Sequence, residues 1–142
     1  MKEFIVENYH FNTPIQIRMS DLDPFAHVNN GTQCHYFDVG RSSYLEHVLQ
    51  EKVDWQTIQL VLVHLEIDFL RPISYENKII CQTKVYEIGT RSLKMIQQIE
   101  DVNTSEIKTV CKSILSGFDR ETLSSSPLDA GQIARLKLFE SL

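Results

Sequence analysis

The fold is decided by the stretch Asn30-Gly-Thr-Gln-Cys-His-Tyr-Phe-Asp-Val-Gly-Arg-Ser-Ser-Tyr-Leu-Glu-His-Val-Leu-Gln50. Large apolar residues and one glycine recur in it at intervals of three and four: Tyr36, Phe37, Gly40, Tyr44, Leu45, Val48 and Leu49. This spacing predicts one long helix of roughly 30 Å with a wide apolar face. A glycine inside a helix costs about 1 kcal/mol relative to alanine, so Gly40 indicates either a close approach to a sheet or a merely tolerated residue.

Strand-like stretches stand on both sides of this helix, at residues 14–19, 60–70, 78–88, 91–100 and 107–118. Short turns at Gly89-Thr90 and at residues 101–105 make the last three an antiparallel meander. Ser126-Pro127 has the form of a helix start, and Ile133, Leu136 and Phe139 mark a short amphipathic C-terminal helix. The expected fold is therefore α+β, with an antiparallel five-stranded sheet wrapped round one long helix, plus a short C-terminal helix; this is the hot-dog architecture.

The overall composition narrows the class of protein. The 142 residues predict a single domain spanning 1–142. The formal net charge is −5 and no run of Lys and Arg stands out, so no nucleic-acid partner is expected. The N-terminal residues carry charges early and lack a long apolar core, so we expect no leader peptide, no membrane anchor and a cytoplasmic location. The widely spaced Cys34, Cys81 and Cys111 are expected to be buried thiols rather than disulfides.

The loop before the helix, Asp21-Leu-Asp-Pro-Phe-Ala-His-Val-Asn-Asn-Gly31, is rich in residues that favour turns and helix starts. Together with Tyr36-Phe-Asp38 and Arg41 it resembles the loop and helix of the hot-dog acyl-CoA thioesterases, of the 4-hydroxybenzoyl-CoA thioesterase type. Its His-Val-Asn-Asn part is also similar to the loop of acyl-ACP thioesterases. Asp68-Phe-Leu-Arg-Pro72 resembles the strand ending of the family, and the order of elements agrees over roughly residues 10–120.

This resemblance implies hydrolysis of an acyl-CoA to the free acid and CoA, without a cofactor. It assigns the catalytic carboxylate to Asp23, and to the backbone N–H of Asn30 the polarisation of the thioester carbonyl. Both roles have a physical basis. An ionised aspartate can attack a carbonyl or orient a water for attack, and the first turn of a helix has unpaired N–H groups with a partial positive charge. The residues do not decide between nucleophile and general base.

The neighbours of Asp23 leave alternatives open. His27, the third predicted catalytic residue, could hydrogen-bond the carboxylate or a water, or could tie the loop to a backbone carbonyl. Asn29 could contact the substrate, although a loop-fixing role is favoured. Asp21 is interpreted as a turn residue, with a share in catalysis as the alternative. No metal site is predicted from Asp21, Asp23 and His27, because the loop lacks the glycine and distal glutamate of a calcium loop and the paired histidines of a zinc helix.

Further substrate contacts are predicted at two places. Gln33 stands where the family usually has tyrosine, and would change the shape or polarity of the acyl pocket. Arg91, with Ser92, aligns with the part of the family that contacts the CoA phosphates; a solvated hairpin charge is the alternative. The family also usually has glycine where Ala26 stands.

Two other functions fit part of the pattern. A hot-dog enoyl-CoA hydratase or dehydratase also places an Asp and a His around a helix start, and a non-catalytic acyl-CoA binding protein would need the pocket alone. An open sheet has unpaired strand edges, and the resemblance implies a homodimer or homotetramer with the site at the subunit boundary. The residues indicate neither the acyl chain nor the choice between CoA and acyl carrier protein.

Overall fold

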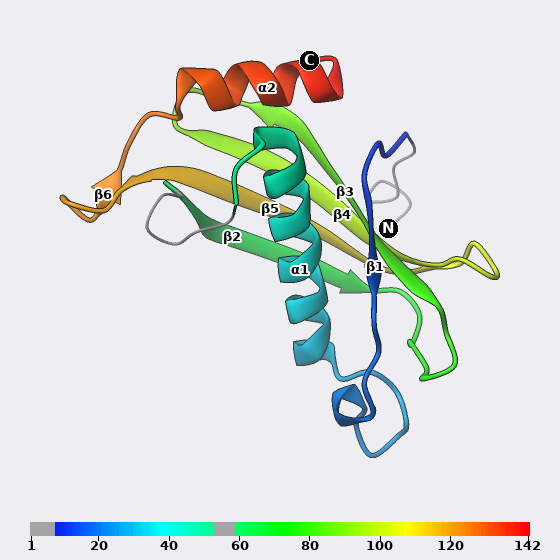
Figure 1. The fold of residues 1–142 in the computed structure, drawn as a ribbon. Coiled ribbons are helices and arrows are strands. Elements are labelled where there is room, and N and C mark those ends of the chain that lie inside the picture. The colour runs from blue at the N-terminus through cyan, green and yellow to red at the C-terminus, as the bar shows by residue number, and fades with distance from the viewer. Residues whose placement is uncertain (1–7, 53–58) are drawn as a thin grey trace.

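The computed structural model describes residues 8–52 and 59–142. In chain order the elements are β1 (Asn12–Ile15), a 3₁₀ turn (Met19–Asp21), α1 (Asn30–Leu49), β2 (Leu60–Phe69), β3 (Ile79–Ile88), β4 (Ser92–Asp101), β5 (Ile107–Asp119), β6 (Ser124–Ser125) and α2 (Ala130–Glu140). α1 lies against one face of the sheet and α2 lies over one end of it (Figure 1). The expected fold is confirmed, with β6 as an addition. Within the described ranges, no helix is long and apolar enough to cross a membrane.

The sheet is antiparallel throughout, in the order β1-β3-β4-β5-β2, and the short β6 pairs with the end of β5. The meander expected for the last three long strands is therefore confirmed. β2 pairs with β5, from Leu60 opposite Gly117 to Phe69 opposite Thr109, so it lies at one edge of the sheet although it precedes β3 in the sequence. β1 occupies the other edge.

The first strand differs from the prediction. Alternation predicts a strand over residues 14–19, whereas β1 covers Asn12–Ile15. The reason is the length of its partner, because Ile15 pairs with Ile79, the first residue of β3, and the chain has no strand to pair with beyond that point. Ile17 nevertheless packs against the core, so its apolar character reflects burial rather than strand pairing.

α1 lies very close to the sheet at Gly40. A Cβ atom added there would collide with the Cys81 Sγ and lie 3.1 Å from the Gln97 Nε2. Of the two interpretations of this glycine, close approach to the sheet is therefore correct. The contact allows Phe37 and Tyr44, on the same face of the helix, to be fully buried.

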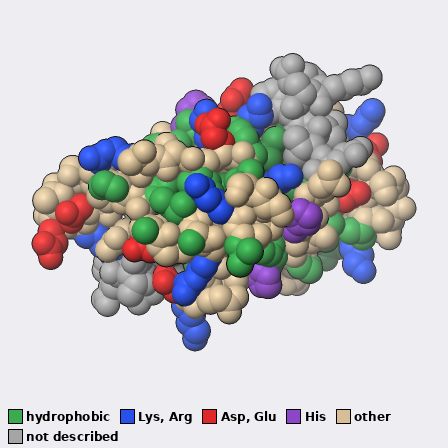
Figure 2. All heavy atoms as spheres, turned by 90° about the horizontal axis from the view of Figure 1, so that it is seen from above, with side chains coloured by type: hydrophobic (Ala, Val, Ile, Leu, Met, Phe, Trp, Pro, Cys, Tyr) green, Lys and Arg blue, Asp and Glu red, His purple; other side chains and the backbone are tan. Residues whose placement is uncertain are grey.

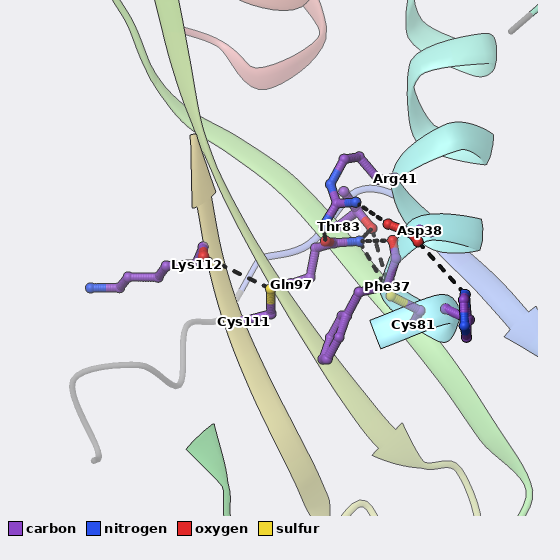
Figure 3. Close-up of polar contacts among 9 residues, drawn as sticks. Phe37, Asp38, Arg41, Cys81, Thr83, Gln97, Cys111 and Lys112 are labelled. Atoms are coloured by element: carbon purple, nitrogen blue, oxygen red, sulfur yellow. Dashed lines mark hydrogen bonds and ion pairs between the residues drawn. The ribbon is translucent and has the colours of Figure 1, made fainter. Parts of the chain in front are cut away.

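A buried polar network joins α1 to the sheet beside this contact (Figure 3). Arg41 donates to Asp38 Oδ1 at 2.7 Å and to Gln97 Oε1 at 3.2 Å, and Gln97 Nε2 donates to the Phe37 carbonyl and to Thr83 Oγ1, both at 3.1 Å. Residues three positions apart on a helix, such as Asp38 and Arg41, ordinarily pair on its surface. Arg41 is instead only 6% exposed, because its side chain turns inward to β4.

The cysteines are free thiols. Cys81 and Cys111 are buried, and desolvation raises the pKa of each thiol to about 12. Cys34 is only partly buried, so the expectation of burial is confirmed for two of the three.

The second helix begins later than predicted. Ser126-Pro127 has the form of a helix start, yet Ser126 and Leu128 donate backbone hydrogen bonds to the end of β5 and to the β3–β4 turn. This stretch therefore remains attached to the sheet, and Asp129 caps α2 instead, accepting a 3.0 Å hydrogen bond from the Gln132 N–H.

α2 closes one end of the core. Leu136 is buried and Ile133 and Phe139 pack beside it, as predicted. Seen from this end, hydrophobic side chains are visible at the surface among Lys and Arg side chains (Figure 2). Leu138 and Leu142 are exposed there. α2 thus adds a cover to the core and still presents apolar side chains outward.

Candidate active site

A cleft of about 230 Å³ lies at the N-terminal end of α1. Three segments form it: the loop before α1, the first turn of α1 and the chain that follows β2. The lining residues are Asp23, His27, Val28, Asn30, Gln33, Phe69, Leu70, Arg71 and Pro72. All three predicted catalytic residues, and the predicted substrate contact Gln33, therefore meet in one place. In Figure 1 this is the end of α1 far from α2.

The loop before α1 fixes the Asp23 carboxylate by one of its oxygens. Asp23 Oδ1 accepts hydrogen bonds from the Phe25 N–H at 2.9 Å and the His27 N–H at 3.2 Å. The Asp23 N–H in turn donates to the His27 carbonyl at 2.8 Å. In the described part of the chain Oδ2 has no hydrogen-bond partner. A half-buried carboxylate is thus held in position with one oxygen available to a ligand.

Backbone hydrogen bonds fasten this loop to the chain that follows β2. The Val28 N–H donates to the Ile73 carbonyl at 2.8 Å, and His27 forms an antiparallel bridge with Ser74. The two walls of the cleft therefore have a fixed relation although about 45 residues separate them in the sequence.

The start of α1 is capped by Asn29. Its side-chain Oδ1 accepts a 2.7 Å hydrogen bond from the Gly31 N–H, and its carbonyl accepts one from the Gln33 N–H at 3.1 Å. The capping role agrees with the loop-fixing interpretation of Asn29. The Asn30 N–H has no partner among residues 8–52 and 59–142. It remains one of the unpaired donors at the positive end of the helix dipole.

Asp21 lies outside the cleft and anchors the loop to the helix. Asp21 is 2% exposed. Its Oδ2 accepts hydrogen bonds from the Tyr36 hydroxyl at 2.6 Å and from the Arg18 N–H at 3.0 Å. Its Oδ1 binds the Arg18 guanidinium. Burial by itself would raise the pKa of Asp21, but the hydrogen bonds from Tyr36 and Arg18 outweigh it and hold this pKa below the usual value. The turn interpretation of Asp21 fits these contacts, whereas the role of Tyr36 has no signal in the sequence.

Gln33 and His27 differ in how firmly they are held. Gln33 is buried, and its Oε1 accepts a hydrogen bond from the Thr109 hydroxyl on β5. The imidazole of His27 is exposed and makes no hydrogen bond with the described residues, so neither ring contact considered from the sequence is present. The backbone of His27, not its ring, ties the loop together.

Arg91 and Ser92 lie far from the cleft within one chain. Ser92 and Leu60 pair with the same end of β5, whereas the cleft residue Phe69 pairs with the opposite end. The ten residues of β2 separate these ends by roughly 30 Å. Arg91 donates from Nη1 to the carbonyl of Ser125 at 3.1 Å and is otherwise exposed. A single chain therefore does not bring Arg91 to Asp23.

Sequence reasoning did not assign a site role to the wall formed by Phe69, Leu70, Arg71 and Pro72. The available signal was the Asp68-Phe-Leu-Arg-Pro72 motif, which predicted only a strand ending. In the described residues, no group of three or more His, Cys, Asp or Glu side chains could hold a metal ion.

The loop contains one strained residue. Ala26 has a φ of 62°, in the left-handed region that glycine adopts without penalty. The glycine that the family usually has here suits this conformation. The loop of this chain keeps the same turn with a side chain present.

This chain is similar in sequence to a known protein family and to one curated protein. The sequence model of the thioesterase superfamily matches residues 25–108. An uncharacterised protein of Bacillus subtilis, YsmA, is 27% identical over 88 residues, which are 62% of this chain and 59% of that protein, so the match spans about three fifths of the relative.

Two solved structures share the fold. A thioesterase from Thermus thermophilus, complexed with coenzyme A and zinc, has a TM-score of 0.84 at 23% identity, covering 96% of this chain and 98% of the other. A 1,4-dihydroxy-2-naphthoyl-CoA thioesterase from Synechocystis has a TM-score of 0.78 at 15% identity, covering 89% and 94%. At these identities the likeness concerns the fold.

Proposed function

The chain belongs to the thioesterase superfamily, and from this premise we propose that it hydrolyses the thioester bond of an acyl-CoA, with Asp23 and the Asn30 N–H as its catalytic groups. One observation carries the proposal. The Asp23 carboxylate and the N-terminal turn of α1 line the same small cleft. A carboxylate opposite unpaired N–H donors is what attack on a carbonyl needs, since one group acts on the carbon and the other binds the oxygen.

The Asn30 N–H acts on the carbonyl oxygen. During attack this oxygen gains negative charge, and an oriented N–H at the end of a helix stabilises that charge without having to reorganise. One such donor contributes about 10²- to 10³-fold in rate. The Asn29 cap keeps the first turn in shape, so it supports the donor indirectly.

Asp23 Oδ2 acts on the carbonyl carbon by one of two routes. As a general base it takes a proton from a water whose oxygen attacks the carbon, and the carbon–sulfur bond then breaks to release the CoA thiolate and the free acid. As a nucleophile it forms a mixed anhydride with release of the thiolate, and water then hydrolyses the anhydride. Both routes use the oxygen that the loop leaves without a partner, because Oδ1 is engaged with Phe25 and His27. A thiolate is a good leaving group, so neither route needs a strong acid.

The CoA part of the substrate, in our proposal, crosses to a second subunit. β2 is a ten-residue edge strand with exposed Leu62, Val63, Leu65 and Phe69, and such an edge favours pairing with another strand. Two copies paired antiparallel through β2 about a two-fold axis would set the start of one β2 beside the end of the other. The partner subunit's Arg91 and Ser92 would then lie near this chain's cleft, where they could bind the CoA phosphates.

The Asp23→Asn variant tests the reaction. In a thiol-release screen across short, long, branched and aromatic acyl-CoAs, the variant should lose about 10²- to 10⁴-fold in kcat, the range of general acid–base catalysis. Its midpoint of thermal unfolding should stay that of the wild type, because Oδ1 of asparagine can still accept both loop hydrogen bonds. Unchanged turnover would contradict the assignment. An absorbance change of enoyl-CoA without thiol release would point to hydration instead.

Mixing two variants with different defects, one in catalysis and one in CoA binding, tests the shared site. Asp23→Asn and Arg91→Ala chains, unfolded and refolded together, should recover about a quarter of the wild-type rate at subsaturating substrate, because half the dimers are mixed and each has one intact site. Chains refolded separately serve as the control. No recovery on mixing, or a fully active monomer in light scattering, would contradict a site completed by the partner.

A further inference from the structure

We propose that Arg71 selects the acyl group by binding an anionic group that the acyl moiety itself carries, within reach of the thioester carbonyl. This inference rests on the proposed function and specifies its substrate class. Arg71 lines the same cleft as Asp23, yet neither route of hydrolysis uses it.

The backbone of Arg71 is held in a fixed place. The N–H groups of Leu70 and Arg71 both donate to the carbonyl of Lys108, each at 2.9 Å, and Pro72 follows directly. The next residue, Ile73, accepts the hydrogen bond from Val28 that fastens the Asp23 loop to this segment. Arg71 and Asp23 therefore keep a constant relation across the cleft.

The guanidinium of Arg71 is only partly neutralised. Its Nε lies 3.5 Å from Glu106 Oε2, but Glu106 also pairs with the Lys108 ammonium at 2.5 Å. One carboxylate thus serves two cations. The Nη groups of Arg71 have no partner in the described part of the chain, and the side chain is 63% exposed. A free guanidinium fork of this kind matches the two oxygens of a carboxylate.

The distance between the thioester and the CoA phosphates decides which anion can reach Arg71. About 230 Å³ is the space of roughly eight water molecules and is less than the ~300 Å³ at which ordinary ligand pockets begin. It can hold the thioester and a few neighbouring atoms. The CoA phosphates lie beyond the whole pantetheine arm, so with the carbonyl at Asp23 and Asn30 they fall outside. An anion bound by Arg71 therefore belongs to the acyl group, as in a short dicarboxylic acyl thioester.

A pair of thioesters with the same shape tests this inference. Glutaryl-CoA carries a terminal carboxylate where 5-methylhexanoyl-CoA carries two methyl groups. Wild-type kcat/KM should favour glutaryl-CoA by about 10- to 100-fold, the effect of one charge-assisted hydrogen bond. Arg71→Ala should abolish this preference while 5-methylhexanoyl-CoA turnover stays within about threefold. Arg71→Lys should retain part of it. Lys78→Ala, which removes an exposed cation outside the cleft, should leave the preference intact.

The N-acetylcysteamine thioesters of the same two acyl groups identify the source of the anion, because they lack phosphates. The preference and its dependence on Arg71 should persist in them. An Arg71 effect seen only with the CoA esters, an equal loss on both acyl groups, or no wild-type preference would each overturn the inference. If the wild type hydrolyses 5-methylhexanoyl-CoA, the proposed function stands whatever Arg71 does. If it hydrolyses none of the four esters and none of the acyl-CoAs in the thiol-release screen, the proposed function itself fails.

Discussion

At its N-terminal end α1 presents an unpaired Asn30 N–H to a cleft beside the half-buried Asp23, whereas at its C-terminal end α2 covers the helix and buries a different carboxylate. That carboxylate is Glu140, whose Oε2 accepts from the Tyr44 hydroxyl at 2.8 Å and from the Val85 N–H at 2.9 Å. Burial, together with the neighbouring Glu140, raises the pKa of Tyr44. The Asp23 carboxylate faces a cleft that a ligand can enter, whereas Glu140 is 6% exposed and its Oε2 joins α1, β3 and α2. Glu140 Oε1 is buried and has no partner among the described residues.

The difference shows how one helix serves two purposes. An unpaired polar oxygen costs least where a ligand or water can reach it, as at Asp23. Paired groups in a buried position hold neighbouring elements together, because breaking them leaves a polar atom without a partner. We therefore expect changes at the N-terminal end to affect the rate and changes at the C-terminal end to affect stability.

The largest stability effect is expected at the covered end. Glu140→Ala leaves the Tyr44 hydroxyl and the Val85 N–H without their buried acceptor, which should lower the free energy of unfolding by about 2–4 kcal/mol. Urea unfolding measures this loss. The kcat of the folded fraction should stay within twofold, because the cleft is at the opposite end of α1. Leu138→Ala, on the exposed side of α2, is the control and should be nearly neutral.

The next largest loss of stability is expected at Asp21, which anchors the loop before α1 to the helix. Asp21→Asn weakens the contacts to Arg18 and Tyr36 and should cost about 1–3 kcal/mol at pH 7. The pKa of Asp21 is lowered in the folded state, so its contribution is present above the unfolded value of about 4 and is lost as pH falls through the lower folded value.

Thermal unfolding of the wild type and Asp21→Asn should accordingly differ at pH 5–7, and the difference should shrink below about pH 4. Asp68→Asn makes the same substitution on the edge strand β2, away from the loop, and serves as the control. A difference that stays constant down to pH 2 would show that the carboxylate charge does not matter at position 21.

The smallest expected effect is a gain in stability. Ala26→Gly removes the penalty of a left-handed alanine but adds freedom to the unfolded chain, for a net stabilisation of about 0.5–1 kcal/mol. The same change in a helix, Ala134→Gly in α2, should destabilise by about 1 kcal/mol. If both variants lose stability equally, the strain at Ala26 does not exist in solution.

Much of this site was predictable from local sequence. The turn-rich loop over residues 21–31 and the helix start near Asn30 depend on residues within a few positions of one another, and they were identified correctly. The loop-fixing role favoured for Asn29 corresponds in the structure to its cap on α1. For Gly40 the sequence left two interpretations open, and the structure shows that the close approach to the sheet is the right one. The start of α2 was predicted wrongly at Ser126-Pro127, since hydrogen bonds to distant parts of the sheet hold that stretch in place.

What the sequence determined by itself is the order of helix and strands and the loop that shapes Asp23, because periodicity and turn chemistry act over short distances. Only the tertiary structure decided that Arg71 lines the cleft with Asp23 and that Thr109 binds Gln33. It also decided that the Arg41 side chain turns inward and that Arg91 lies at the far end of the sheet. These placements follow from strand order and register. Both are set by how the whole core packs, and no short stretch of residues encodes which distant segment will lie beside it.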